Sequence, residues 1–234
     1  MNTDSTFYFL ALQAVEGIGC RGARKLLEHF GCPKKVLLAD EGALLGIQGI
    51  GPKLVENLKS KIIFSRANSE MEKLQRRKIK VASYVDTEYP KLLRNCEDAP
   101  LLLFYKGTLK FDNRPILSIV GTRKMTTYGA SFLKRLFQEM EQYDPVIVSG
   151  MAYGVDILAH RLALKHGLKT IGVLAHGMDR IYPRDHYSTA LNMIKDGALI
   201  TEFWTGTPPE KMNFVKRNRI IAGISQATPV SYTH

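Results

Sequence analysis

From residue 111 onward, short apolar runs alternate with longer segments that have helical spacing of apolar residues, and this alternation constrains the fold most. Four of the runs are expected strands: ILSIV (116–120), PVIVS (145–149), KTIGVLA (169–175) and ALITE (198–202). They are apolar on both faces, which is typical of strands buried between two layers of helices. The sequence therefore predicts an α/β fold with a doubly wound, mostly parallel sheet. The intervening helices are expected over about 127–142, 154–166, 185–196 and 214–224.

The amino-terminal part of the chain is different, because apolar residues recur there at helical spacing with almost no alternation of period two. Two of its segments resemble each other, VEGIGCRGARKLLEHF (15–30) and IQGIGPKLVENLKS (47–60), and each has a Gly-Ile-Gly turn before a helix. We therefore expect a small all-α domain over 1–66 and the α/β domain over 67–234. The second domain is expected to start with a basic helix at SEMEKLQRRKIK and strands at VASYV and LLLFYKG.

Composition restricts the compartment and the kind of partner. The sequence has no apolar run of 18 residues and no basic-then-apolar amino terminus, so we expect a cytoplasmic protein without a membrane span or secretory signal. Three cysteines without a CxxC spacing favour neither a disulfide framework nor a zinc cluster. The net charge of +11 indicates a polyanionic partner, nucleic acid or an anionic membrane, although a solubilising surface is the alternative.

Ligands of an open parallel sheet bind beyond the carboxyl ends of its strands, so the residues that follow each predicted strand are the candidate site. Gly121, Thr122 and Arg123 follow the first strand. The later loops add glycines, a serine, an aspartate and a cationic helix: Ser149, Gly150, Gly154, Asp156, Phe214, Lys216, Arg217, Asn218 and Arg219. Glycine lets the backbone approach an anion, amides at a helix start point toward it, and arginine adds a two-pronged donor. Together the loops predict a phosphate site, with Tyr128, Tyr182 and Phe214 available to stack on bases.

Each of these loops, taken singly, is also explained by a tight strand–helix turn without a ligand. Asp156 and His160 share one helix face, as an acid–base pair or as a helix-start carboxylate with a hydrogen-bonded neighbour. Ser149 lacks a nucleophile elbow, because the GxSxG context is absent around it. HExxH and Walker motifs are absent from the sequence, and the histidines share no ligand spacing. We expect no catalytic residue, no metal and no cofactor.

The two amino-terminal turns have a mechanism of their own. Backbone amides at the helix starts after Gly17, Gly19, Gly49 and Gly51 are able to hold a nucleic-acid phosphate without reading sequence, assisted by Lys53. The alternative is that both turns serve only for packing or protein contact.

The loops as a set resemble a known family. The runs SIVGTRKMTTYG, SGMAYGVDILAH, GMDRIYP and FVKRNRIIAGIS are similar, in order and spacing, to the motifs of the DprA/Smf family of bacterial DNA-processing proteins. The resemblance covers roughly residues 80–227. The tandem turns resemble the helix-hairpin-helix or SAM-like domain that often precedes the DprA core.

The resemblance implies an extended Rossmann-like domain that binds single-stranded DNA in place of a dinucleotide. Members of the family protect incoming single strands during natural transformation, load the RecA recombinase and act as homodimers, without being enzymes. The family's nucleotide pocket corresponds to these positions: Gly121, Thr122, Arg123, Ser149, Gly150, Gly154, Asp156, Phe214, Arg217, Asn218 and Arg219. A second hypothesis is a nucleotide-processing hydrolase that releases base from nucleoside monophosphates, with Glu202 and Asp156 as the carboxylates.

The carboxyl terminus departs from the expected pattern. The next strand should begin near Ala227, but Pro229 lies inside it and removes a ladder hydrogen bond. We therefore expect a displaced strand or, preferably, a chain that is truncated within the domain and ends in non-native residues at 228–234. The family core continues beyond this point, so dimer formation by this chain is left open.

Overall fold

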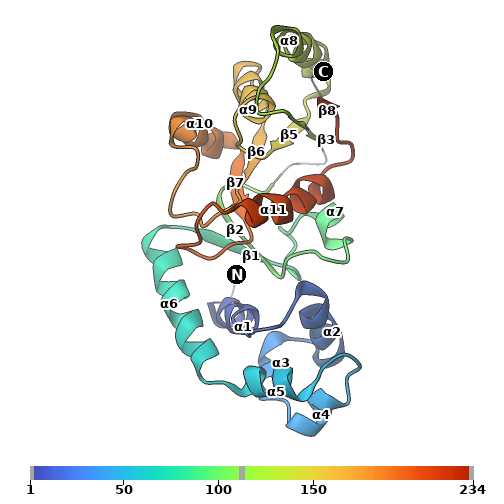
Figure 1. Cartoon of the computed structure of the whole chain (residues 1–234), viewed down its shortest axis with the longest axis vertical. Helices are drawn as coiled ribbons and strands as arrows, with labels where there is room; N and C mark the ends of the chain where they lie inside the picture. The colour runs from blue at the N-terminus through green and yellow to red at the C-terminus, as the bar shows by residue number, and fades with distance from the viewer. Residues whose placement is uncertain (1–2, 111–113, 232–234) are drawn as a thin grey trace.

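A helical unit precedes an α/β unit in the computed structural model, which describes residues 3–110 and 114–231 (Figure 1). The helical unit contains six helices among the described residues: α1 (Thr3–Gln13), α2 (Cys20–Phe30), α3 (Pro33–Leu38), α4 (Glu41–Leu45), α5 (Pro52–Lys59) and α6 (Ile62–Arg76). The strands that follow are β1 (Lys80–Ser83), β2 (Leu102–Gly107), β3 (Ile116–Ser118), β4 (Val120–Gly121), β5 (Val146–Ser149), β6 (Thr170–Val173), β7 (Ala198–Thr201) and β8 (Val230–Ser231). The helices between them are α7 (Lys91–Arg94), α8 (Thr127–Met140), α9 (Val155–Lys165), α10 (Tyr187–Asp196) and α11 (Lys211–Ile224), with 3₁₀ turns at Glu141–Tyr143 and Arg184–His186.

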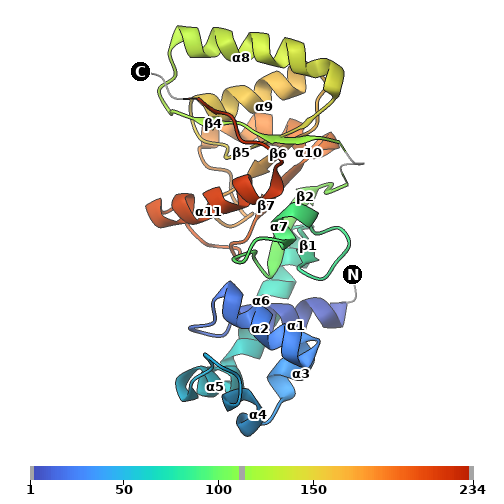
Figure 2. The same ribbon diagram turned by 90° about the vertical axis from the view of Figure 1, so that its right-hand side faces the viewer.

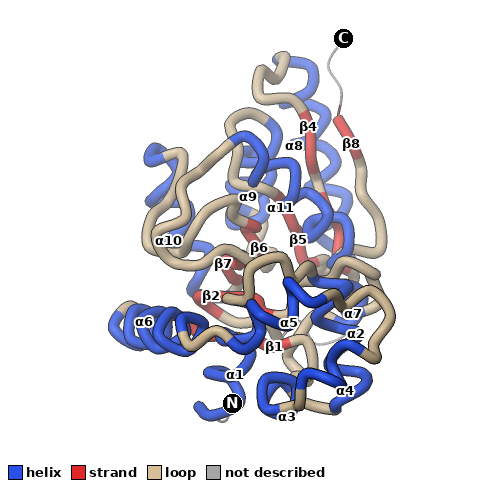
Figure 3. Tube along the Cα trace, turned by 60° about the horizontal axis from the view of Figure 1, so that its bottom comes forward, coloured by secondary structure: helices blue, strands red, loops and turns tan. Residues whose placement is uncertain are grey.

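The main sheet has six strands in the order β1-β2-β7-β6-β5-β3. Strands β7, β6, β5 and β3 are parallel, whereas β1 and β2 pair antiparallel and β2 joins β7 antiparallel. The carboxyl ends of four strands therefore lie at one edge, as predicted. β4 follows β3 in the chain after one residue and pairs in parallel with β8, which lies beside it (Figure 3).

Helices cover both faces of this sheet. α8, α9 and α10 lie on one face, and α7 and α11 lie on the other (Figure 2). The alternation of side chains in β5 produces these layers, because Val146 and Val148 pack with Ile220 of α11 while Ile147 packs with the α8–α9 layer. The predicted α/β fold with a preceding helical domain is confirmed.

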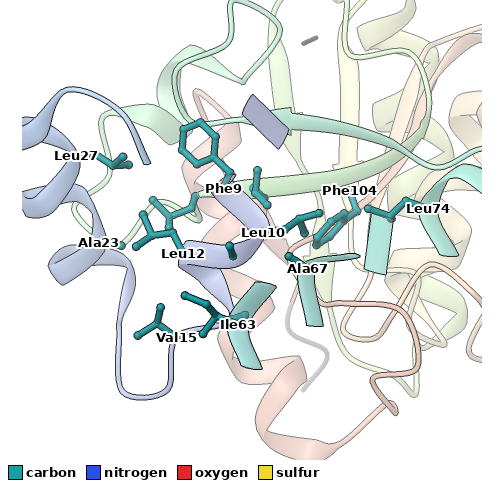
Figure 4. Close-up of a cluster of buried hydrophobic side chains, with 14 of the residues drawn as sticks. Phe9, Leu10, Leu12, Val15, Ala23, Leu27, Ile63, Ala67, Leu74 and Phe104 are labelled. Carbon is teal, nitrogen blue, oxygen red and sulfur yellow. The ribbon is translucent and has the colours of Figure 1, made fainter. Parts of the chain in front are cut away.

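The apolar core runs without a break from the helical unit into the sheet. Leu10 and Leu12 of α1 have no exposed surface, and the same cluster reaches Leu74 at the end of α6 and Phe104 of β2 (Figure 4). α6 is the structural link, since it starts among the helices and ends at β1 (Figure 1). The predicted domain boundary at residue 66 falls inside α6 and stays a prediction.

Polar contacts reinforce this junction. The Glu70 carboxylate on α6 is buried and accepts hydrogen bonds from Thr205 N and Thr205 Oγ1, both at 2.7 Å. Trp204 Nε1 donates to Gln13 Oε1 on α1 at 2.9 Å, and the Arg66 guanidinium lies 5.7 Å from the Trp204 ring centroid. The loop after β7 is thereby fixed to two helices of the helical unit.

Some boundaries differ from the predicted ones. The run ILSIV is divided between β3 and β4, because Ile119 donates to Val148 O while its neighbour Ser118 donates to Ala227 O. α11 begins at Lys211, three residues before the predicted start.

The carboxyl-terminal strand forms despite its proline. Ala227 bridges Leu117 in parallel, and Pro229 contributes its carbonyl oxygen, which accepts from Val120 N at 3.4 Å. The ladder does not need an N–H from Pro229, so the proline is tolerated there. Residues 232–234 of the predicted non-native end lie outside the described residues.

Candidate functional site

The loop after β4 lies at the carboxyl edge of the sheet and presents Arg123 to solvent. Gly121 closes the strand, and Thr122 Oγ1 accepts from Lys124 N at 3.1 Å, which holds the turn. α8 begins only at Thr127, where Thr126 Oγ1 accepts from Gly129 N at 3.1 Å and caps the helix. The helix start is thus four residues beyond Arg123, so the turn is wider than the predicted strand–turn–helix.

The loop after β5 packs backbone to backbone against this turn. Val155 N donates to Thr122 O at 3.2 Å, and Gly154 adopts φ +78° beside it. A Cβ added to Gly154 would lie 2.2 Å from Thr122 O, closer than real atoms approach. Gly154 is therefore needed for contact between two loops, a packing role that differs from the predicted approach to a ligand.

Beneath the loops lies a buried polar layer. Arg217 is 3% exposed, and its Nη1 donates to Gly150 O at 2.5 Å and to Val173 O. Burial lowers the pKa of Arg217 to about 10 while Asp156 opposes the shift, so Arg217 is a cation at neutral pH. Ser149 Oγ donates to Ile119 O at 2.6 Å. These residues hold the loop after β5 in place from below.

Asp156 belongs to this layer as well. Its carboxylate is 5% exposed in the first turn of α9 and accepts from Ala152 N at 3.4 Å. Burial raises the pKa of Asp156 and the nearby Arg217 opposes this. His160 instead pairs its Nδ1 with Thr170 Oγ1 at 2.7 Å, without exposed surface. The structure therefore supports the helix-start interpretation of Asp156 over an acid–base pair.

The exposed layer of the site consists of one arginine and two aromatic rings. The Arg123 guanidinium lies 5.5 Å from the ring centroid of Phe214, a half-buried residue in the first turn of α11. Tyr182, 47% exposed in the loop after β6, lies 6.1 Å from Phe214 between centroids at an interplanar angle of 59°. Lys216 and Asn218 are exposed on the same helix. Three of the four predicted loops and α11 therefore meet here.

Two other predicted residues lie elsewhere. Tyr128 is 74% exposed in the first turn of α8. Arg219 is two residues beyond Arg217, roughly on the opposite side of α11, and donates to Asp98 O at 2.6 Å and to Glu202 Oε2. Glu202 and Asp156 thus face opposite sides of α11, so the structure does not bring together the carboxylate pair of the hydrolase hypothesis.

The two glycine turns of the helical unit form a matched pair. Lys25 Nζ in the first repeat donates to Gln48 O in the second at 2.8 Å. In return, Asn57 Nδ2 in the second repeat donates to Glu16 O in the first at 3.0 Å. Both the donors and the acceptors are equivalent positions, 32 residues apart. Gly17 and Gly49 adopt φ of +82° and +90°, and added Cβ atoms there would meet nothing within 4 Å. Gly19 and Gly51 are the N-caps of α2 and α5.

The surroundings of the two turns differ. The start of α2 lies against the α/β unit, where Arg21 pairs with Glu97 at 2.7 Å and Arg24 donates to Cys96 O at 2.5 Å. The start of α5 is exposed, and Lys53 pairs with Glu56 at 2.8 Å. The first turn is thus partly used for contact within the chain.

Sequence reasoning missed the residues that fix the loops from a distance. Glu70, Gln13 and Trp204 join the loop after β7 to the helical unit. Met151 adopts φ +60°, which is uncommon for a residue other than glycine, and its carbonyl accepts from His186 Nδ1 at 2.8 Å. Glu70, Gln13 and Trp204 have no local motif, and their only signal was the lone tryptophan of the chain.

Comparison with known proteins identifies the family of the chain. Residues 80–233 match the family described as DNA recombination-mediator protein A. The chain belongs to the DprA/Smf family. Residues 9–63 match the SAM-like helix-hairpin-helix tandem, which coincides with the matched turns of the helical unit.

Individual DprA and Smf proteins are similar over much of the chain. Protein Smf of Synechocystis is 34% identical over 95% of this chain and 57% of its own length. DNA processing protein DprA of Streptococcus pneumoniae is 39% identical over 64% of this chain and 52% of its own length. The corresponding Bacillus subtilis protein is 41% identical over 61% and 48%. The chain spans about half the length of the curated relatives it matches.

Two solved DprA structures are similar to the fold. The X-ray structure of the Streptococcus pneumoniae protein superposes with a TM-score of 0.74 at 29% identity, covering 96% of this chain and 77% of that one. The Helicobacter pylori protein, described for its single-stranded DNA binding mode, gives a TM-score of 0.58 at 29% identity over 65% of this chain and 68% of that one. In the described part of the chain no helix is long and apolar enough to cross a membrane.

Proposed function

We propose that the chain binds single-stranded DNA on the exposed layer formed by Arg123, Phe214 and Tyr182. The observation that carries the proposal is the joint placement of a solvent-facing guanidinium and two aromatic rings at the carboxyl edge of the sheet. Membership of the DprA/Smf family and the DNA-binding mode described for the Helicobacter pylori protein support it.

The exposed and buried residues have separate tasks in this proposal. Arg123, close to Gly121 and Thr122, donates bidentate hydrogen bonds to a backbone phosphate. Phe214 and Tyr182 stack on bases. In a single strand these bases are free to turn toward the rings, whereas a duplex keeps them stacked and paired. Lys216 and Asn218 extend the polar surface along α11, and Tyr128 is a further stacking candidate.

The buried layer acts through the loops. Arg217, held by Gly150 O and Val173 O, is not free to bind a phosphate without losing those bonds. We propose that Arg217, Ser149, Asp156 and Gly154 fix the loop shape. Their contribution to affinity is then preorganisation of the surface.

The glycine turns of the helical unit stay a secondary proposal. All four glycines are exposed, but Arg21 and Arg24 at the start of α2 contact Glu97 and Cys96 of the α/β unit, so we favour Gly49, Gly51 and Lys53 over Gly17 and Gly19. A strand that leaves the sheet edge would gain backbone contacts there without sequence preference.

The binding test compares labelled oligothymidylate with duplex DNA of the same length across a salt series. We expect preference for the single strand and a negative slope of log affinity against log salt, from a few phosphate contacts. Arg123→Ala should weaken binding by about 1–3 kcal/mol through loss of a charge-assisted pair. Arg135→Ala, an exposed arginine on α8, is the charge-matched control and should change affinity little. A flat salt slope, stronger duplex binding, or equal effects of the two variants would refute the proposal.

For the full-length protein we propose the family role in recombination: protection of incoming single strands during natural transformation and delivery to the RecA recombinase, as a homodimer. The DNA recombination-mediator description of the family supports this. Nuclease protection of a bound oligonucleotide and RecA-dependent strand exchange, each with and without the full-length protein, are the measurements. Unchanged nuclease sensitivity would contradict protection, and an unchanged exchange rate would contradict RecA loading.

A further inference from the structure

Tyr153, in the loop after β5, lies beside the exposed layer of the site. It is 46% exposed, almost the same fraction as Tyr182 in the loop after β6. The next residue, Gly154, contacts the turn that carries Arg123, since a Cβ added to Gly154 would lie 2.7 Å from the Arg123 carbonyl oxygen. The backbone of Tyr153 is therefore held next to the Arg123 turn, at the carboxyl edge of the sheet.

Contacts with the segment after β6 fix the Tyr153 ring. Its hydroxyl donates to Asp185 Oδ2 at 2.9 Å, and the ring centroid lies 4.9 Å from that of His186 at an interplanar angle of 71°. His186 is buried, and its Nδ1 bonds with Met151 O at 2.8 Å in the same loop as Tyr153. A T-shaped contact of this kind occupies at most one face of the tyrosine ring. Because the ring is already fixed, stacking of a base on it costs little conformational entropy.

Tyr153 and Tyr182 are neighbours across the two loops. The hydrogen bond to Asp185 is the main cause that raises the pKa of Tyr153, and Tyr182 is near enough to add to the rise. Tyr182 in turn lies 6.1 Å from Phe214 between ring centroids. Three rings from three segments of the chain therefore share one surface, and proteins that bind single strands stack successive bases on such rings.

We propose that Tyr153 stacks on a second base, adjacent in the strand to the base held by Phe214 and Tyr182. The inference rests on the proposed binding of single-stranded DNA and extends that site to two successive nucleotides. Three rings exceed what one flat base needs, because a base has only two faces to stack. The exposed Arg184 beside Asp185 offsets the charge of that carboxylate, so the pair adds no net negative charge to the surface.

The competing role for Tyr153 is a clasp, in which its hydroxyl only ties the loop after β5 to Asp185. A clasp needs the hydroxyl, whereas stacking needs the ring. Tyr153→Phe keeps the ring without the hydroxyl, and Tyr153→Ala removes both, so the two variants separate the roles. Tyr143→Ala is the matched control, because Tyr143 is 67% exposed and precedes β5, at the opposite edge of the sheet.

Fluorescence anisotropy with the intact chain measures the contribution of each base. The probes are labelled DNA hexamers of abasic nucleotides that carry either one thymine or two adjacent thymines. In the unaltered chain the second thymine should strengthen binding about tenfold, from one additional base–ring stack. Tyr153→Phe and Tyr143→Ala should keep this gain, whereas Tyr153→Ala should reduce it to about twofold, the statistical gain from offering two bases to one stacking site.

A gain that persists unchanged in Tyr153→Ala would overturn the proposal, and so would the absence of a gain in the unaltered chain. Equal loss of the gain in Tyr153→Phe and Tyr153→Ala would also overturn it, because that result assigns Tyr153 to the clasp. The proposed function itself fails by a different result, namely that the unaltered chain does not bind oligothymidylate.

Discussion

Arg123 and Arg217 have the same chemistry and opposite surroundings. Arg123 is exposed above Phe214, whereas Arg217 is buried with its Nη1 on two backbone carbonyls. Sequence reasoning placed both in one phosphate pocket, because residue type alone does not report burial. The spacing of Arg217 with Ile220, Ile221 and Ile224 on α11 was the available signal, since these four residues share the face that packs on the sheet.

At the scale of single residues, the buried His160 makes the stability of the fold depend measurably on pH. Burial lowers the pKa of His160 to about 3, so the folded protein keeps this ring neutral while the unfolded chain protonates near its usual value of 6.5. The unfolded state then binds more protons below pH 6.5, and stability falls as pH falls. For this residue the loss is about 1.4 kcal/mol per pH unit, or roughly 2 kcal/mol at pH 5.

The measurement is urea unfolding of the chain and of His160→Gln at pH 5.0 and pH 7.5. The variant lowers the free energy of unfolding at both pH values. The drop in this free energy from pH 7.5 to pH 5.0 should, however, be about 2 kcal/mol smaller in the variant than in the unaltered chain. Taking the difference between the two proteins removes the contributions of His176 and His186, whose pKa values burial also lowers, and of Asp156 and Glu202, whose pKa values it raises. If the free energy of unfolding dropped equally in both proteins between pH 7.5 and pH 5.0, His160 would be protonated in the folded state.

The elements at the sheet edge support one another through close backbone contact. The loop after β4 and the loop after β5 meet at Gly154, where a side chain would strike Thr122 O. This contact explains why a glycine stands there, and it leaves Arg123 on the outside of a fixed turn.

Gly154→Ala should therefore destabilise the protein by about 2–4 kcal/mol, from a disfavoured φ and from overpacking against the neighbouring loop. Gly167→Ala is the matched control, because Gly167 has φ +67° with no atom near its missing Cβ. Gly167→Ala should therefore lose only the free energy of the backbone strain, roughly 1 kcal/mol. Urea unfolding monitored by circular dichroism measures both, and equal values would mean that the loops move apart at little cost.

The order and type of most elements were predictable from sequence, because strands buried on both faces and amphipathic helices have distinct periods. The division of ILSIV was not, since it depends on which distant backbone groups pair with Ser118 and Ile119. Pro229 was interpreted as an obstacle to a strand, although its carbonyl is all that the ladder uses. For the site, the three residues of the exposed layer were named from sequence, whereas the burial of Arg217 and the turn of Arg219 toward Glu202 were not.

At the scale of the whole molecule, the helical unit and the α/β unit share one apolar cluster and a set of buried polar contacts. These contacts join residues far apart in sequence, such as Glu70 to Thr205, so no local sequence pattern predicts them. The loop after β7 is thereby positioned from the helical side of the molecule.

Glu70→Ala should weaken this junction by about 2–4 kcal/mol, because the N–H and hydroxyl of Thr205 lose a charged acceptor in a buried setting. Glu72→Ala, an exposed glutamate on the same helix, is the control and should stay within about 0.5 kcal/mol. The free energy of urea unfolding measures both. Equal effects would show that water replaces the carboxylate without loss.

The position of Trp204 allows this junction to be followed by tryptophan fluorescence. It is the single tryptophan of the chain, and its indole sits where Gln13 and Arg66 of the helical unit meet the loop after β7. With excitation at wavelengths that the ten tyrosines do not absorb, the ultraviolet emission of an unlabelled sample therefore comes from one known place. A shift of its emission maximum toward the red would register separation of the two units, on the timescale of a stopped-flow trace and without an added dye.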